Sequence, residues 1–195
     1  MLKLYDLSGK NDLRFSPPCW NVKLCLIQNN IKLAAKKGRI FGSDQVAYGS
    51  TRNDGRSWRQ WAYETYDFDP NRLHFSPPLQ YKEYVEVLQH SWVHVYWTIP
   101  FILSWGLMEA LSTGCAVVAS NTDPVKEVIR PGEHGILVDF YDTDGLAGRV
   151  DELLRDSKRR HDLGTSARHM ILTNGYDLNQ CLHQKRRSID ELLHG

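Results

Sequence analysis

Residues 104–119 of the chain read SWGLMEALSTGCAVVA, and this stretch decides the fold. The segment Ser104–Thr113 predicts a helix that Gly114 ends, because glycine tolerates the left-handed backbone conformation of a helix C-cap. Cys115–Ala119 is apolar throughout, which is typical of a strand buried on both faces. A helix that leads directly into a buried strand favours an α/β fold.

Strand and helix patterns alternate on both sides of this stretch, from Arg39 to the C-terminus. Strands are expected at Arg39–Phe41, Leu73–Phe75, Val93–Tyr96, Cys115–Ala119 and Gly135–Val138. Helices are expected at Ser57–Tyr66, Tyr81–Gln89, Ser104–Thr113, Thr143–Arg155, Lys158–Thr173 and Leu178–Leu193, and another opens at Asp123-Pro124 with Asp123 as its N-cap. This alternation predicts a Rossmann-like parallel sheet with helices on both faces. In such sheets ligands bind beyond the carboxyl ends of the strands.

The first 38 residues do not continue this alternation. We expect a strand at Leu2–Tyr5 and a helix at Trp20–Ile27. The chain is therefore divided into an N-terminal extension, residues 1–38, and a domain, residues 39–195.

The composition is typical of a globular protein, with 42% apolar and 24% charged residues. A formal net charge of +1 argues against a nucleic-acid partner. No apolar run approaches the ~20 residues of a membrane helix, and Asp6, Lys10 and Asp12 interrupt any secretory signal. The four cysteines and eight histidines lack metal-ligand spacing. We therefore expect a cytoplasmic protein with no metal, no nucleic-acid partner and no integral membrane segment.

Glu109 is the main candidate for a binding residue. Its neighbours in the helix are apolar, so the helix is expected to be buried, and a buried carboxylate needs hydrogen-bond donors such as ribose hydroxyls. The helix start, Ser104 to Leu107, presents free backbone amides and the positive end of the helix dipole to an anion such as a diphosphate. Gly106 lets a ligand approach the backbone closely. On residue type alone, Glu109 also fits a partly exposed glutamate or one paired with an internal arginine.

Residues 93–138 contain three motifs in close succession: EALSTGCAVVAS at 109–120, PVKEVI at 124–129 and GEHGILV at 132–138. They resemble the donor-binding domain of the family 4 retaining glycosyltransferases, which have the GT-B fold. The resemblance implies that residues 39–195 are one half of a GT-B fold and that the substrate is a nucleotide-sugar donor, with no cofactor. It also implies that Glu109 contacts the ribose of the nucleotide.

The chain departs from the family at the first of its two signature glutamates, which falls on Phe101. The loop before the helix instead resembles an aromatic-rich subgroup, through Trp97, Pro100, Phe101, Ser104 and Trp105. The resemblance thus implies a donor site made of Phe101, Ser104, Trp105, Gly106, Leu107 and Glu109, with the catalytic residues unidentified. Five aromatic residues are expected to belong to the core: Tyr81, Tyr84, Trp92, Tyr96 and Trp97. The alternative is that one of them lies near the cleft and covers a nucleobase.

In the family the acceptor binds to a second domain, and the chain is too short to contain it. We therefore expect a glycosyltransferase donor-binding domain that transfers a glycosyl group only with a separate acceptor-binding domain or chain. The alternative is a truncated or fused fragment without catalytic activity.

Residues 1–28 resemble a different family, the opening of glutathione S-transferase-like proteins. The matching pieces are LKLYDL at 2–7, FSPPCW at 15–20 and VKL at 22–24. The resemblance implies that Ser16 activates a glutathione thiol, so a glutathione-dependent transferase is a further alternative. The simpler reading makes Ser16 a helix N-cap and Cys19 a packing residue.

Overall fold

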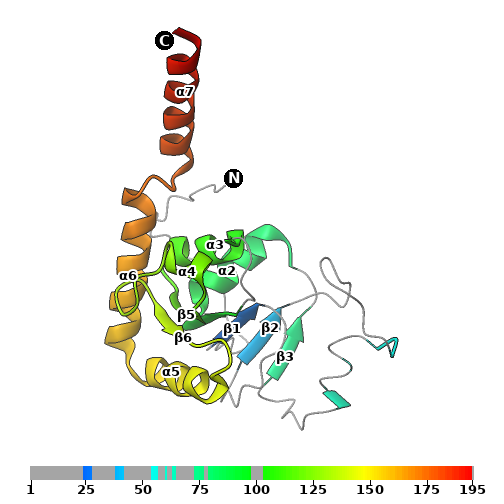
Figure 1. The fold of residues 1–195 in the computed structure, drawn as a ribbon. Helices are drawn as coiled ribbons and strands as arrows, with labels where there is room; N and C mark the ends of the chain where they lie inside the picture. Colours follow the sequence, from blue (N-terminus) through cyan, green and yellow to red (C-terminus); the bar gives the residue numbers. More distant parts are fainter. Residues whose placement is uncertain are drawn as a thin grey trace, which may run out of the picture.

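The computed structural model of the chain describes residues 54–56, 60, 63–64, 79–97 and 103–194, together with the backbone of three strands at 24–27, 38–41 and 73–76 (Figure 1). The strand expected at Leu2–Tyr5 and most of the helix expected at Ser57–Tyr66 lie outside these residues.

The described strands form one six-stranded sheet in the order β3-β2-β1-β4-β5-β6, and each neighbouring pair is parallel. The strands are β1 (Leu24–Ile27), β2 (Gly38–Phe41), β3 (Leu73–Ser76), β4 (Val93–Tyr96), β5 (Ala116–Ser120) and β6 (Ile136–Val138). The parallel α/β sheet that the sequence predicts is therefore confirmed. All of its carboxyl ends lie at one edge, where ligands of such sheets bind.

One expected element is wrong. The helix predicted over Trp20–Ile27 is a strand at Leu24–Ile27, and this β1 pairs with β2 on one side and β4 on the other. The run LCLI is a short, continuously apolar segment, and periodicity alone does not separate a buried strand from a buried helix at that length. A strand from residues 1–38 thus belongs to the same sheet as the strands that follow Arg39.

Helices cover both faces of the sheet (Figure 1). They are α2 (Tyr81–His90), α3 (Trp105–Thr113), α4 (Asp123–Lys126), α5 (Thr143–Arg155), α6 (Ser157–Thr173) and α7 (Leu178–His194). On one face, α2, α3 and α6 enclose a cluster that includes Leu88, Leu107, Leu111, Val117, Ile129 and Ile171. On the other face, α5 encloses a cluster that includes Val93, Val95, Val118, Leu146, Val150 and Leu153. Successive residues of β4 and β5 enter opposite clusters, as the side-chain alternation of a strand requires.

The junction between α3 and β5 has the geometry that the sequence predicts. Gly114 has φ 77°, and its amide donates to the carbonyl oxygens of Ala110 and Leu111. The amide of Cys115 then donates to Ala110 at 3.3 Å, and the chain enters β5 directly. The glycine therefore turns the chain from a helix into the sheet without a loop.

The start of α4 differs by one residue from the expectation. The N-cap is Thr122 rather than Asp123, its hydroxyl makes no capping hydrogen bond, and Pro124 lies in the first turn as predicted. The carboxylate of Asp123 instead pairs with Lys126 at 3.2 Å. Pro124 carries no amide hydrogen for a cap to accept, and the amide of Val125 donates to the carbonyl of Thr122 at 3.0 Å rather than to its hydroxyl.

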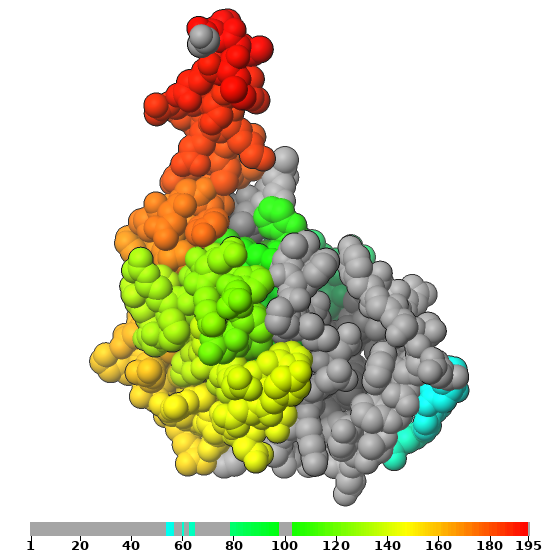
Figure 2. Space-filling model, viewed as in Figure 1, coloured from blue at the N-terminus to red at the C-terminus, as the bar shows by residue number. Residues whose placement is uncertain are grey.

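The last helix, α7, extends away from the body of the molecule (Figures 1 and 2). None of its residues is buried. Its apolar side chains are exposed and recur at helical spacing: Leu182, Ile189, Leu192 and Leu193. Near its first turn, the Gln180 side chain donates to the carbonyl of Leu172 at 3.1 Å and Cys181 Sγ donates to the carbonyl of Gly175.

Candidate functional site

The candidate site is the amino end of α3, which follows the carboxyl end of β4 in the chain. Ser104 is the N-cap: its Oγ accepts from the amide of Gly106 at 3.1 Å, and its carbonyl accepts from Met108 at 3.4 Å. In the described part of the chain, the amides of Trp105 and Leu107 have no acceptor. The first turn contains no acidic side chain. The positive end of the helix dipole is therefore available to an anion.

The open face of α3 begins at this amino end. Trp105, Gly106 and Glu109 lie on the same side of the helix, because residues three and four apart are neighbours on a helix surface. Trp105 is 64% exposed, while Gly106 and Glu109 are half-buried. The opposite side holds Leu107 and Leu111, which are fully buried.

The apolar neighbours of Glu109 predicted a buried helix, but Glu109 is half-buried, which agrees with the alternative of a partly exposed glutamate. Its apolar neighbours do not enclose it, since they face the sheet while Glu109 lies on the open side with Trp105. Within the ranges that the structure describes, its carboxylate makes no hydrogen bond and no ion pair. The alternative of a pair with an internal arginine is thus not met among these residues.

Tyr84 also approaches this end of α3, whereas the sequence interpretation assigned it to the core with a nucleobase contact as the alternative. It lies on α2, its ring packs against the apolar cluster under α2 and α3, and its hydroxyl reaches the first turn of α3. A Cβ atom on Gly106 would lie 3.4 Å from Tyr84 Oη and 3.5 Å from Ser104 Oγ. No local sequence signal joins two residues so far apart, because helix packing alone brings them together.

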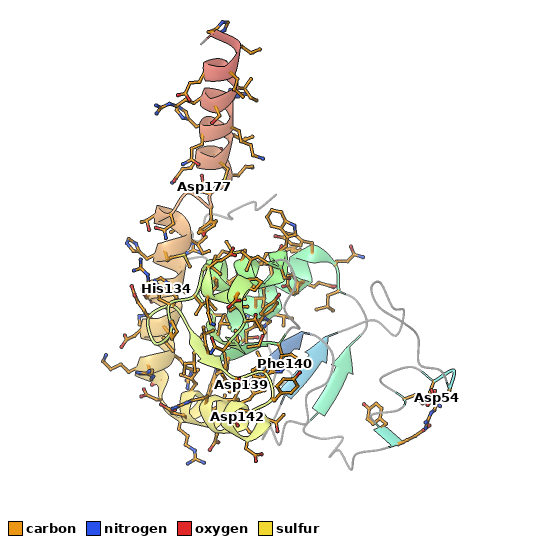
Figure 3. The ribbon with its side chains drawn as sticks, viewed as in Figure 1. Asp54, His134, Asp139, Phe140, Asp142 and Asp177 are labelled. Carbon is orange, nitrogen blue, oxygen red and sulfur yellow. The ribbon has the colours of Figure 1, made fainter. Side chains whose placement is uncertain are left out.

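Two aromatic residues after β4 and β6, Trp97 and Phe140, pack in the second apolar cluster, whereas Tyr141 is exposed. Trp97 is buried and stacks on Phe140, with ring centroids 5.9 Å apart, and Phe140 meets Tyr141 edge to face. Asp139 and Asp142 lie near Phe140 (Figure 3), and their carboxylates accept backbone amides of the turn and of the start of α5. Trp97, which the sequence placed in the aromatic loop before α3, therefore belongs to the second apolar cluster.

Two predicted site residues lie outside the described residues. Phe101 is in the segment between β4 and α3, and Ser16 is in the N-terminal extension. The glutathione site inferred from Ser16 has no described geometry.

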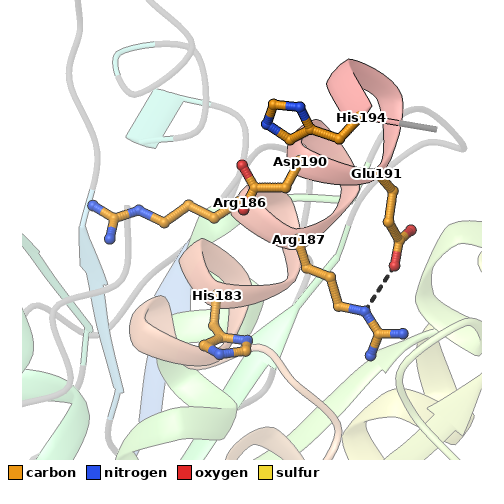
Figure 4. A pocket seen from close by; sticks show the side chains of 6 residues that line it. All are labelled: His183, Arg186, Arg187, Asp190, Glu191 and His194. Carbon is orange, nitrogen blue, oxygen red and sulfur yellow. Dashed lines mark hydrogen bonds and ion pairs between the residues drawn. The ribbon is translucent and has the colours of Figure 1, made fainter.

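A surface hollow lies along α7, away from α3 (Figure 4). The described residues that line it are exposed and come from this one helix: His183, Arg186, Arg187, Asp190, Glu191 and His194. Arg187 Nε donates to Glu191 Oε1 at 2.8 Å. The two arginines and two acids balance, so this is the solvated face of an amphipathic helix. None of the described helices is both long enough and apolar enough to cross a membrane.

Residues 69–170, just over half of the chain, match the family model described as "Glycosyl transferases group 1". A mannosyltransferase of Mycolicibacterium smegmatis, named GDP-mannose-dependent alpha-(1-6)-phosphatidylinositol monomannoside mannosyltransferase, is 34% identical over 67 residues, which are 34% of this chain and 18% of that protein. The N-acetyl-alpha-D-glucosaminyl L-malate synthase of Bacillus anthracis is 31% identical over 65 residues, 33% of this chain and 17% of that protein.

Solved structures of glycosyltransferases share the fold. Anabaena Alr3699/HepE in complex with UDP-glucose has a TM-score of 0.68 at 13% identity, over 88% of this chain and 49% of that one. Sucrose-phosphate synthase of Thermosynechococcus elongatus has a TM-score of 0.66 at 19% identity, over 89% of this chain and 46% of that one. The chain thus spans about half the length of these structures, and the aligned segments are less than a fifth of the curated relatives.

Proposed function

Because the chain belongs to the group 1 glycosyltransferase family, we propose that it binds a nucleoside diphosphate sugar at the amino end of α3. The diphosphate lies against the amides of Trp105 and Leu107, beside the Ser104 hydroxyl. The ribose hydroxyls donate to the carboxylate of Glu109. Trp105 borders the same ligand from the solvent side. In this proposal the substrate is the sugar donor, and no further cofactor takes part.

One observation carries the proposal: among the described residues, a half-buried carboxylate without a partner lies on the same helix face as an amide end without acceptors. The two features attract different parts of one ligand. Helix amides and the dipole favour an anion, whereas a carboxylate accepts hydrogen bonds from hydroxyl groups and repels anions. Glu109 is one helical turn beyond Trp105, a rise of about 6 Å along the helix axis. A ligand with a sugar ring next to a phosphate group satisfies both.

The chemistry that follows is transfer of the glycosyl group to an acceptor hydroxyl. The bond between the anomeric carbon and the diphosphate oxygen breaks, and a new glycosidic bond forms as the acceptor loses its proton. The amide end of α3 stabilises the negative charge that develops on the departing diphosphate, an electrostatic contribution to the transition state. Retention at the anomeric carbon is part of the proposal, on the resemblance to the retaining family.

The acceptor and its binding groups belong to a part outside these 195 residues, either another domain or another chain. Half-length coverage of the solved relatives supports this division. We therefore expect this chain to bind the donor and to transfer sugar poorly until the acceptor-binding part is added.

Calorimetric titration of the chain with UDP, GDP and ADP tests the binding half of the proposal. The nucleotide that binds best is then titrated into Glu109→Gln, which keeps the shape and removes the charge. Loss of a charged hydrogen bond to the ribose is expected to weaken binding about 10-fold. The matched control is Glu152→Gln, because Glu152 is an exposed glutamate on α5, at the opposite face of the sheet.

Equal affinities for wild type and Glu109→Gln would remove Glu109 from the site. If none of the three nucleotides bound the wild-type chain, the proposed function itself would be rejected. Unfolding of each variant in urea, measured alongside, separates an effect on the site from an effect on the fold.

A further inference from the structure

The apolar side chains of α7 form one stripe on a helix that stands away from the body of the molecule (Figures 1 and 2). The α7 stripe consists of four residues that are between 44% and 86% exposed: Leu182, Ile189, Leu192 and Leu193. Their spacing puts them on one side of a helix with 3.6 residues per turn. Large apolar side chains that are gathered in this way, unlike scattered ones, mark an interaction surface.

Two basic residues border the α7 stripe. Lys185 is three residues after Leu182 and four residues before Ile189. Arg186 is four residues after the first of these and three residues before the second. Residues at these spacings are neighbours on a helix surface, so both cations lie beside the apolar side chains. Both are exposed, and among the described residues neither has an ion pair with an acid.

Arg187 lies on the other, polar side of α7. Its Nε donates to Glu191 Oε1 at 2.8 Å, so this arginine is ion-paired. In Figure 4 the side chains of Arg186 and Arg187 leave the helix in different directions. The neighbours of Arg187 at three and four residues are all polar: His183, Gln184, Asp190 and Glu191. The two sides of α7 therefore differ both in polarity and in the pairing of their basic residues.

The position of Lys185 decides between the surfaces that would cover the stripe. In a dry contact with a second copy of the chain, the ammonium group would be buried amid apolar side chains, which is costly without a partner. At a bilayer surface the carbon stem of a lysine lies along the acyl chains while its ammonium group reaches the headgroups. Anionic headgroups also attract Lys185 and Arg186. The charge pattern of the stripe thus fits an anionic lipid surface.

We propose that α7 lies in the surface of a bilayer that contains anionic lipids, with the α7 stripe against the acyl chains and Lys185 and Arg186 at the headgroups. This binding is peripheral, because no described helix is able to cross a bilayer. None of the residues of α7 is buried, so the helix binds without any rearrangement of the described core. The inference goes beyond the proposed function and does not depend on it.

Co-sedimentation of the whole chain with sucrose-loaded vesicles tests the inference. One set of vesicles contains phosphatidylcholine alone, and the other contains equal amounts of phosphatidylcholine and phosphatidylglycerol. The partition coefficient is expected to be at least about 10-fold higher for the mixed vesicles, since each of two basic residues near an anionic surface contributes about 5-fold.

Two variants with matched controls test which side of α7 meets the lipid. Leu192→Asn removes the most exposed side chain of the stripe and is expected to reduce partitioning onto the mixed vesicles about 10-fold. Its control on the polar side, Gln184→Asn, is expected to stay within about 2-fold of wild type. Arg186→Gln is expected to reduce partitioning about 5-fold, whereas Arg187→Gln stays within about 2-fold because the charge lies on the side away from the bilayer.

Three outcomes would overturn the inference. Wild type that does not sediment with the mixed vesicles is the first. Equal losses for Arg186→Gln and Arg187→Gln are the second, because they would indicate a general attraction between charges rather than one binding side. The third is a wild-type dimer in light scattering that Leu192→Asn converts to a monomer, which would assign the stripe to a second copy. Nucleotide titrations measure the proposed function separately, since α7 is not part of the site at α3.

Discussion

The α-carbon of Gly164, in the middle of α6, packs against the carbonyl oxygen of Gly114, the residue that ends α3: a Cβ atom on Gly164 would lie 2.0 Å from that oxygen. This contact brings α6 onto the junction between α3 and β5, where Arg168 of α6 also donates to the carbonyl of Ser112. The helix that carries the candidate site is therefore fixed at its carboxyl end by backbone contact with another helix.

Gly164→Ala is expected to destabilise the chain by about 3 kcal/mol, because backbone atoms on both sides must move apart to admit the methyl group. Urea unfolding measures the change. The matched control is Gly148→Ala, at an exposed position of α5 where a Cβ atom would meet nothing within 4 Å. That variant is expected to gain about 1 kcal/mol from helix propensity. A Gly164→Ala protein as stable as wild type would show that α6 does not approach Gly114 so closely.

The burial of His94 predicts that the free energy of unfolding depends on pH. The imidazole lies on β4 and is fully buried, neither ring nitrogen has a hydrogen-bond partner in the described structure, and burial lowers its pKa from 6.5 to about 4. The folded state therefore keeps His94 neutral at pH values where the unfolded state already binds a proton. The contribution of His94 to the free energy of unfolding is fully present above pH 6.5 and decreases as the pH falls towards 4. Between pH 6.5 and pH 5 the free energy of unfolding decreases by about 1.5 kcal/mol.

His94→Leu isolates this contribution, because all other titrating groups are common to both proteins. Urea unfolding of wild type and variant at pH 6.5 and pH 5 should show the stability difference shifting in favour of the variant at the lower pH. Parallel pH profiles for the two proteins would mean that His94 is solvated or hydrogen-bonded in the folded state.

Ser104→Asp separates the stability of α3 from its proposed anion binding. Aspartate caps helices about as well as serine, and its charge interacts favourably with the helix dipole, so the free energy of unfolding is expected to stay within about 0.5 kcal/mol of wild type. The same charge repels a diphosphate, and nucleotide affinity is expected to fall at least about 10-fold. Calorimetry and urea unfolding measure the two effects. Unchanged affinity would place the phosphate groups elsewhere.

The sequence predicted most of the described sheet, because its strands carry strong local signals. β5 follows a glycine cap, and β4 and β6 alternate with clearly amphipathic helices. The apolar run at Leu24–Ile27 had no such context, and its pairing with both β2 and β4 depends on contacts far away in the sequence. A four-residue strand of this kind is identified by its partners and not by its own pattern.

The candidate site was predicted in part. The sequence predicted a helix that begins at Ser104 with open amides at its start, whereas in the structure Ser104 is the N-cap and the helix begins at Trp105. The apolar neighbours of Glu109 predicted a buried helix, whereas Glu109 is half-buried, which agrees with the alternative of a partly exposed glutamate. The pattern misleads because Trp105 and Gly106 count as apolar while they form the open side of the helix. The approach of Tyr84 to Gly106 was not predicted, because it is a product of helix packing.

The position of β1 has a consequence for any attempt to isolate the domain. Among the described strands, only β1 joins β2 and β3 to β4, β5 and β6. A protein trimmed to residues 39–195 would therefore lose the strand that connects the two parts of the sheet. β2 and β4 would then each present a row of unpaired amides and carbonyls, the kind of exposed edge that recruits strands from other molecules. Such a trimmed protein would aggregate rather than fold into a smaller version of the same domain.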